Sequence, residues 1–123
     1  MKPGTIGWHD LTVDDASGLR DFYSKVCGWN WTPHSLGDYD DFVMSPGEPD
    51  EAVAGICHAR GVNAGMPAQW ISYVVVEDVE AAVARCQEMG GELLDGPRSA
   101  GGGSMACIRD PAGAVLGLYQ TGD

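Results

Sequence analysis

Val53-Ala54-Gly55-Ile56 and Val115-Leu116-Gly117-Leu118 decide the fold, because they are two copies of one strand pattern. The copies lie 62 residues apart (117 − 55 = 62), and the same offset brings Trp8 onto Trp70. A constant spacing of this kind indicates that one supersecondary unit is repeated. Two copies of a unit often enclose one ligand cavity.

Each copy is predicted to contain one strand, one helix and three further strands. In the first copy we expect strands at 5–13, 29–34, 39–45 and 51–59, and a helix between Asp15 and Gly28. In the second we expect strands at 69–76, 92–97, 103–109 and 115–120, and a helix between Asp78 and Gly90. The order is therefore βαβββ, twice.

These units predict an α+β fold and one domain over residues 1–123. Unit one covers about 5–59 and unit two about 67–121. A single βαβββ unit cannot close its own sheet, so the two are expected to pair. The expected result is a pair of curled antiparallel sheets around a cup, with the helices outside.

Composition excludes several classes of partner. The formal net charge is −11 and the chain has only seven Lys and Arg residues, so neither nucleic acid nor an anionic membrane is an expected partner. No apolar run approaches the roughly 20 residues of a membrane span, and no signal peptide is recognisable. The four cysteines have no CxxC spacing, which favours a reduced, cytoplasmic location.

Alternation along the first strand of each unit sorts residues onto two faces. The face toward the helices is predicted to carry Leu11, Val13, Tyr73 and Val75. The opposite, concave face is predicted to carry Trp8, Asp10, Thr12, Trp70, Ser72 and Val74. A mixed face of aromatic, acidic and hydroxyl groups is typical of a ligand-binding cup.

The chain resembles the vicinal oxygen chelate superfamily, which includes glyoxalase I, extradiol dioxygenases and the fosfomycin- and bleomycin-resistance proteins. The resemblance covers nearly the whole chain and rests on the order and spacing of several short motifs. These motifs are the stretch from Trp8 to Asp14, Phe22-Tyr23, Gly28-Trp29, the stretch from Val75 to Val79, Gly90-Gly91, and the stretch from Asp110 to Leu118.

Metal-using members place a His, Gln or Glu early in the first strand of a unit and a Glu in the last strand. In this sequence those positions are Trp8 and Trp70, and Gly55 and Gly117, none of which can coordinate a metal. The pattern is similar to a branch often labelled glyoxalase-like or hydroxylase. The resemblance therefore implies the fold, and the departures predict no metal and no other cofactor.

Two indoles and two glycines at these positions predict a flat, apolar slot for an organic molecule. The open alternative is that the indoles pack on each other and fill the cup. The expected ligand-binding residues are Trp8, Thr12, Gly55, Cys57, Trp70, Ser72 and Gly117.

Asp10 is the one candidate catalytic residue. A carboxylate beside indoles is partly desolvated, which raises its pKa toward the range of a general base. The alternative is a structural hydrogen bond to Thr12, Ser72 or a backbone amide. Cys57 is expected to be buried and inert, and Cys27, Cys86 and Cys107 to lie in the core.

His9, His34 and His58 allow a different hypothesis, a metal site formed by three strands. Nothing in their spacing requires them to converge, so surface or edge positions are the simpler interpretation.

Three functions follow from these observations. The first is a metal-independent protein that binds a small aromatic or apolar molecule. The second is an enzyme of the same fold, a lyase, isomerase or hydroxylase that uses Asp10 as its base. The third is a metal-dependent lyase, isomerase or dioxygenase with ligands at unusual positions. Whether the chain is an enzyme stays open, as does a homodimer, because this fold often dimerises.

Overall fold

The computed structural model describes residues 1–122. The strands of the described chain are β1 Ile6–Val13, β2 Asn30–Ser35, β3 Asp40–Ser45, β4 Ala54–His58, β5 Trp70–Val75, β6 Glu92–Ala100, β7 Gly103–Arg109 and β8 Val115–Gln120. The helices are α1 Ala16–Cys27 and α2 Val79–Glu88, with short 3-10 turns at Pro49–Glu51 and Gly61–Asn63. The predicted α+β class and the βαβββ order of both units are confirmed.

The chain divides into two compact units. The N-terminal unit is His9–Trp70. The C-terminal unit is Ile71–Asp123 together with Met1–Trp8. The first residues join the C-terminal unit through backbone hydrogen bonds, because Val75 N donates to Thr5 O and Gly4 N donates to Val75 O.

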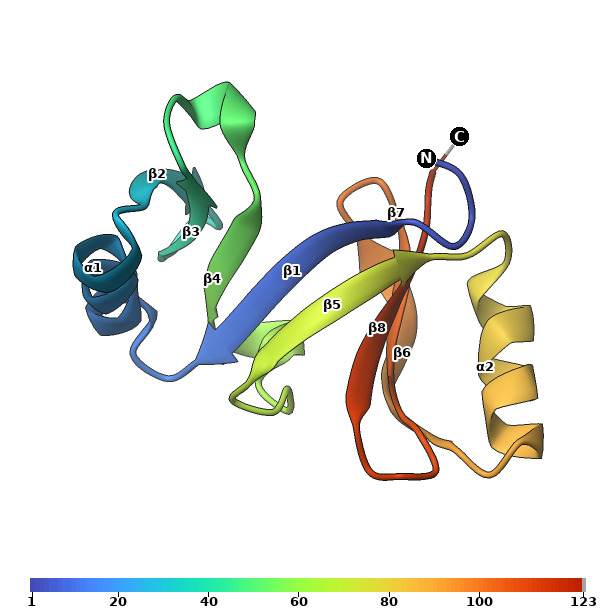
Figure 1. Cartoon of the computed structure of the whole chain (residues 1–123). Helices are drawn as coiled ribbons and strands as arrows, with labels where there is room; N and C mark the ends of the chain where they lie inside the picture. Colours follow the sequence, from blue (N-terminus) through green and yellow to red (C-terminus); the bar gives the residue numbers. More distant parts are fainter. Residues whose placement is uncertain (123) are drawn as a thin grey trace. The chain divides into compact units, whose positions relative to one another are not determined.

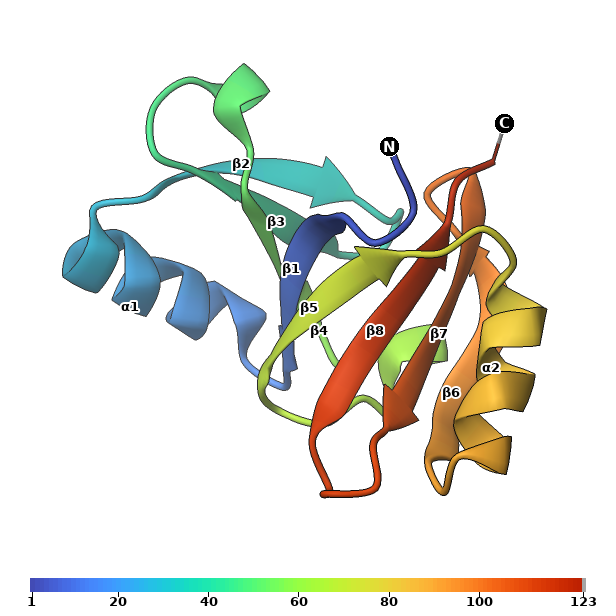
Figure 2. The same ribbon diagram turned by 45° about the vertical axis from the view of Figure 1, so that its right-hand side comes forward.

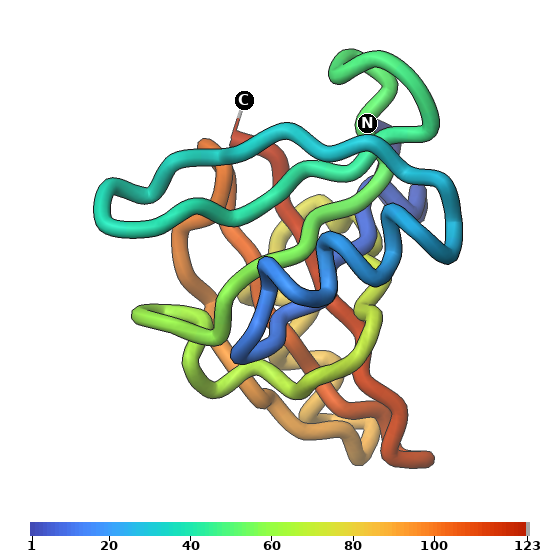
Figure 3. The backbone as a smooth tube through the Cα atoms, turned by 90° about the vertical axis from the view of Figure 1, so that its left-hand side faces the viewer, coloured from blue at the N-terminus to red at the C-terminus, as the bar shows by residue number. Residues whose placement is uncertain are grey.

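In the N-terminal unit the strands run in the order β2-β3-β4-β1. Two pairings are antiparallel, but β1 runs parallel to β4, with Asp10 opposite Gly55 and Leu11 opposite Ile56. The prediction of wholly antiparallel sheets is therefore wrong for this strand pair. Figures 2 and 3 show β2 and β3 side by side with α1 next to them. The core between helix and sheet contains Ala16, Phe42, Met44, Ala54 and Ile56.

In the C-terminal unit the order is β5-β8-β7-β6, and β5 likewise runs parallel to β8. The helix α2 covers one face of this sheet (Figure 1). Its core contains Val79, Val83, Ala106 and Leu118, with Leu93, Ile108 and Leu116 packed around them. A parallel first and last strand is what a βαβββ unit requires when its helix crosses over the sheet, since β4 and β8 each return beside the strand that begins the unit.

Both helices begin and end where their terminal residues predict. The Asp15 carboxylate accepts a hydrogen bond from Gly18 N, and Gly28 ends α1 with φ 77°. The Asp78 carboxylate accepts from Glu80 N and Ala81 N at the start of α2. These are the N-cap and left-handed C-cap arrangements that satisfy otherwise unpaired backbone groups.

The repeat does not keep one offset throughout. The core residues Ile56 in β4 and Leu118 in β8 are 62 apart. Val13, the last residue of β1, and Val76, directly after β5, both pack against the core of their unit and are 63 apart. Strand pairing agrees, because Asp10 lies opposite Gly55 whereas Tyr73 lies opposite Gly117. The predicted equivalence of Trp8 and Trp70 is therefore wrong, and Trp8 aligns with Ile71.

This shift changes the predicted faces of β5. A Cβ atom on Gly117 would lie 2.3 Å from the Tyr73 ring, so Tyr73 shares the face of Gly117, away from α2. Val74 pairs with Leu118, which packs against α2. By alternation, Ser72 and Val74 point toward the helix side and Tyr73 and Val75 away from it, the reverse of the prediction. In β1, Val13 packs with the α1 core and Leu11 pairs with Ile56, as predicted.

Candidate functional site

The parallel pairing of β1 and β4 gathers four of the predicted site residues on one face of the N-terminal sheet. Asp10 lies opposite Gly55 and Thr12 lies opposite Cys57, while the intervening Leu11 and Ile56 face α1. We call this group, Asp10, Thr12, Gly55 and Cys57, the β1–β4 face. It combines a carboxylate, a hydroxyl and a thiol around a residue that has no side chain.

Burial and charge keep the Cys57 thiol protonated. Burial raises the pKa of Cys57, and the nearby carboxylates of Asp10 and Asp41 raise it further. A protonated thiol is a poor nucleophile. The prediction of an inert Cys57 agrees with this environment. On the β1–β4 face the thiol can serve a ligand as a weak donor and as apolar surface.

Asp41 is a residue that the sequence interpretation missed. Its side chain is buried, and its Oδ1 accepts a hydrogen bond from His58 N at 2.8 Å. The same oxygen lies 3.4 Å from Nδ1 of His58. A charged residue directly before the apolar run Phe42-Val43-Met44 is the only sequence signal for it, and that signal also fits a solvated strand end.

Trp70 does not form a flat floor of the kind predicted. Its indole Nε1 donates a hydrogen bond to the Tyr23 hydroxyl at 3.1 Å. The indole meets the rings of Tyr23 and Trp29 edge-on, with centroids 5.3 and 5.8 Å apart. Trp70 is thus held against α1 in an aromatic cluster with Phe22, Tyr23 and Trp29. Trp8, by contrast, is partly buried on β1 and alternates onto the same side as Asp10.

Gly117 leaves no room for a ligand above it, because the Tyr73 ring occupies that space. Ser72 points toward the α2 side of its sheet. The predicted ligand contacts at Gly117 and Ser72 are therefore wrong. Both errors come from the one-residue shift of β5, which reverses every side chain of the strand.

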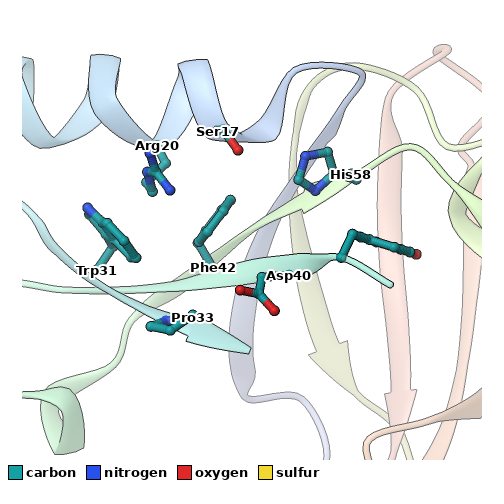
Figure 4. Close-up of a pocket in the computed structure, with 8 residues that line it drawn as sticks. Ser17, Arg20, Trp31, Pro33, Asp40, Phe42 and His58 are labelled. Carbon is teal, nitrogen blue, oxygen red and sulfur yellow. The ribbon is translucent and has the colours of Figure 1, made fainter. Parts of the chain in front are cut away.

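The described part of the N-terminal unit also contains a cavity of about 400 Å³ between α1 and the sheet. Its lining residues are Ser17, Arg20, Trp31, Pro33, Tyr39, Asp40, Phe42 and His58. Figure 4 shows Ser17 and Arg20 extending from the helix toward Phe42, Trp31 and Asp40 on the strands. We call it the α1 cavity. The sequence interpretation did not find it, because its residues come from four separate elements.

The remaining candidates lie apart from these two places. His9 and His34 are exposed, whereas His58 is largely buried beside Asp41. Within residues 1–122, no three or more His, Cys, Asp or Glu side chains are grouped closely enough to hold a metal ion. Cys107 is buried as predicted, but Cys27 is exposed, because it is the last residue of α1 and lies beyond the buried side of the helix.

Across the described residues, no helix is long and apolar enough to cross a membrane.

The fold agrees with the family comparison. The chain belongs to the Glyoxalase/Bleomycin resistance protein/Dioxygenase superfamily, whose family model matches residues 5–118. The predicted resemblance is confirmed at the level of the superfamily.

Named relatives lie in actinobacteria. The chain is 34% identical over 125 residues to "Putative glyoxylase CFP32" of Mycobacterium tuberculosis, which covers 97% of this chain and 46% of the relative. It is also 34% identical over 135 residues to the anthracycline biosynthesis protein DnrV of Streptomyces peucetius, covering 99% and 49% respectively. The chain therefore spans about half the length of the curated relatives it matches.

Solved structures show the same fold at low identity. A methylmalonyl-CoA epimerase of Streptomyces coelicolor, in complex with 2-nitronate-propionyl-CoA, matches with a TM-score of 0.60 at 13% identity, covering 99% of this chain and 100% of that one. The epimerase of Mycobacterium tuberculosis matches with a TM-score of 0.57 at 17% identity, covering 98% and 93%. At these identities the likeness concerns the fold alone.

Proposed function

We propose that this protein binds a small aromatic or apolar molecule without a metal, in the manner of the bleomycin-resistance members of its superfamily. The observation that carries the proposal is the register of β1 and β4, which places Asp10, Thr12 and Cys57 around Gly55. Gly55 and Trp8 stand where metal-using members have ligands, and neither can coordinate a metal. Gly55 adds no side chain of its own to this face, and the polar groups beside it offer directional contacts to an organic ligand.

The names of two groups of relatives support a small-molecule role. One group is named for glyoxylase and the other for anthracycline biosynthesis. An anthracycline carries fused aromatic rings, which are the kind of flat, apolar body that this proposal assigns to the ligand. Because the chain spans about half of each relative, the activity of those longer proteins enters here only as support for the ligand class.

The experiment is a thermal-shift and fluorescence titration of tag-free protein with flat aromatic compounds, using acridine as the reference probe. Gly55→Leu adds a bulky side chain to the β1–β4 face and is expected to weaken binding by about tenfold or more. Thr12→Val changes only a hydroxyl and gives a second measurement if Gly55→Leu fails to fold. Cys27→Ser, at an exposed residue, is the control. Unchanged affinity in both site variants would contradict the proposal.

The alternative function is an enzyme that uses Asp10 as a general base. The Asp10 carboxylate favours it, because this group lies close enough to Cys57 to raise the pKa of that thiol, and a carboxylate positioned beside a ligand can act as a base. Asp10→Asn separates the two functions. If Asp10 is a base, the variant still binds ligand but loses turnover, whereas a polar anchor changes affinity only modestly.

Metal independence and assembly need separate measurements. Elemental analysis of the purified protein is expected to show no stoichiometric divalent metal. One metal ion per chain that is lost in His9, His34 or His58 variants would support the metal-dependent alternative instead. We further propose a cytoplasmic location and a homodimer, and light scattering coupled to size-exclusion chromatography tests the dimer.

A further inference from the structure

The α1 cavity lies on the other side of the N-terminal sheet from the β1–β4 face. Phe42, which lines the cavity, belongs to the core that packs against α1. Asp10 and Gly55 alternate onto the opposite face. The cavity is thus a separate place with its own chemistry, and no part of the proposed function uses it.

Arg20 forms a flat wall of the cavity. Its guanidinium carbon lies 4.2 Å from the centre of the Trp31 ring and 4.6 Å from that of Phe42. Its Nε and Nη2 donate to the Asp21 carboxylate at 2.9 and 3.3 Å. One face of the cation is covered by rings and one edge by a carboxylate, so Arg20 contributes a stacking surface more than a free positive charge.

His58 presents an acceptor to the cavity. Its Nδ1 is buried without a hydrogen-bond partner and lies 3.4 Å from the buried Asp41 carboxylate. A carboxylate at this position favours the tautomer with the proton on Nδ1. In that tautomer Nε2 is the acceptor of a ring that lines the cavity.

The other lining groups include both acceptors and donors, and the donors are the Tyr39 hydroxyl, the Trp31 indole N–H and the remaining N–H groups of Arg20. Asp40 adds a carboxylate at the rim opposite the helix (Figure 4), and Ser17 adds a hydroxyl that can donate or accept. Trp31, Pro33 and Phe42 supply apolar surface. An anionic ligand would meet the Asp40 carboxylate and the partly neutralised Arg20, whereas a ligand that brings a neutral O–H donor satisfies His58 or Asp40.

We propose that the α1 cavity is a second binding site, which takes a small neutral aromatic molecule with a hydroxyl group, that is, a phenol. The ring packs against Pro33 and against the face of the Arg20 guanidinium that Trp31 and Phe42 leave uncovered, and the hydroxyl donates to Nε2 of His58. Asp41 positions the imidazole without touching the ligand. The cavity volume of about 400 Å³ suits a ligand of one or two rings.

The test uses three matched probes observed by fluorine NMR: 4-fluorophenol, 4-fluoroanisole and 4-fluorobenzoate. The phenol is expected to bind about tenfold more tightly than its methyl ether, because only the phenol can donate to His58, and more tightly than the anionic benzoate. Equal affinity for phenol and ether, tightest binding of benzoate, or no binding of the phenol would overturn the proposal.

Variants test whether the preference for phenol over its methyl ether depends on His58. His58→Phe keeps an aromatic ring but is expected to abolish the preference for phenol over ether, while His58→Gln keeps a polar atom near the Nε2 position and retains much of it. Arg85→Leu, on α2, is the control and is expected to change nothing. If His58→Phe fails to fold, His58→Leu, which also lacks an acceptor, takes its place, and retention of the full preference for phenol over ether in that variant contradicts the proposal.

The second site and the proposed function can fail independently. Acridine bound at the β1–β4 face is expected to survive His58→Phe, and 4-fluorophenol bound in the α1 cavity is expected to survive Thr12→Val. Loss of both ligands in either variant would contradict the separation of the two sites.

Discussion

The two βαβββ units share one order of elements but fill the space beneath their helices differently. Beneath α1 lie the aromatic rings of Trp31 and Phe42, stacked with Arg20, next to His58. Beneath α2 lie aliphatic side chains around Val83 and Leu118. The architecture is thus duplicated while the interior is not, and the polar groups suited to recognition collect in the N-terminal unit.

The faces of the two sheets that point away from the helices also differ, because polar groups lie on the N-terminal one and an aromatic ring on the C-terminal one. At one position of the pairing, Asp10 lies opposite Gly55, and at the corresponding position Tyr73 lies opposite Gly117. The tyrosine ring fills the space that its glycine leaves, whereas the aspartate contributes a charge near Cys57. One glycine therefore serves packing, and we propose that the other serves a ligand.

The largest expected change in the free energy of unfolding tests whether the two units unfold together or separately. Ile56 and Leu118 occupy equivalent core positions and are both buried. Ile56→Ala and Leu118→Ala should each lower the free energy of unfolding by about 2–5 kcal/mol, because each removes buried methyl groups and leaves a cavity. We expect both variants to shift one shared transition in urea, followed by circular dichroism and indole fluorescence. Two separable transitions would contradict the single domain predicted from the sequence.

The next effect tests how the C-terminal glycine is used. Gly117→Ala puts a methyl group against the Tyr73 ring and is expected to destabilise the protein by about 1–3 kcal/mol, the usual range for overpacking. In a Tyr73→Leu background the same change should cost clearly less, since the ring is gone. Chemical denaturation of the four proteins measures this coupling, and equal costs in both backgrounds would refute the contact.

The thiols give a pH dependence of similar size. Burial raises the pKa of Cys107 to about 11, against about 8.5 for an unfolded cysteine. Because the folded pKa is the higher one, this stabilisation is complete below about pH 8.5 and is lost as pH rises toward 11. The free energy of unfolding should therefore fall by up to about 1.4 kcal/mol per pH unit for such a thiol.

The test of this pH dependence is Cys107→Ala, which should make the decline between about pH 8.5 and 10.5 shallower in denaturation experiments, while the buried Cys57 thiol, whose pKa is also raised, maintains the rest. Cys27→Ala, which alters an exposed thiol, should leave the decline unchanged. An identical decline in both variants would mean that Cys107 is not its source.

The smallest effect compares the helix starts. Asp78 accepts two backbone N–H bonds and Asp15 accepts one. Asp78→Ala should cost about 1 kcal/mol of unfolding free energy, and Asp15→Ala a smaller amount within the usual capping range of about 0.5–2 kcal/mol. Thermal unfolding ranks the two, and a larger loss in Asp15→Ala would reverse this part of the comparison.

Most of the fold could be predicted from the sequence, because its signals are local. Turn and capping residues such as Asp78 and Gly28 fix element boundaries within a few residues. The repeat then fixes the βαβββ order. The repeat could not reveal that β5 is shifted by one residue relative to β1. Such a shift leaves the apolar content of the strand unchanged, but it moves every side chain to the opposite face of the sheet.

The site was predicted only in part, for a related reason. That Asp10, Thr12, Gly55 and Cys57 share one face of the sheet was predictable, because alternation within β1 and β4 is enough to place them, and their contact with a ligand stays a prediction. The α1 cavity was not predictable, because Arg20, Trp31 and His58 meet only through the packing of a helix on a sheet. His58 and Asp41 are 17 residues apart, and their contact follows neither the helix nor the strand repeat, so the sequence pattern does not predict it.

The attachment of Met1–Trp8 to the C-terminal unit has a consequence for synthesis on the ribosome. The hydrogen bond from Gly4 N to Val75 O spans 71 positions (75 − 4 = 71), so the leading residues emerge long before their partner strand exists. Residues 9–70 can complete their own sheet in that interval, while the first residues wait unpaired. Closing this long loop is expected to be a late, slow event in folding, because distant pairings cost more chain entropy. Residues 1–8 are therefore synthesised before residues 9–70 and are expected to pair after them.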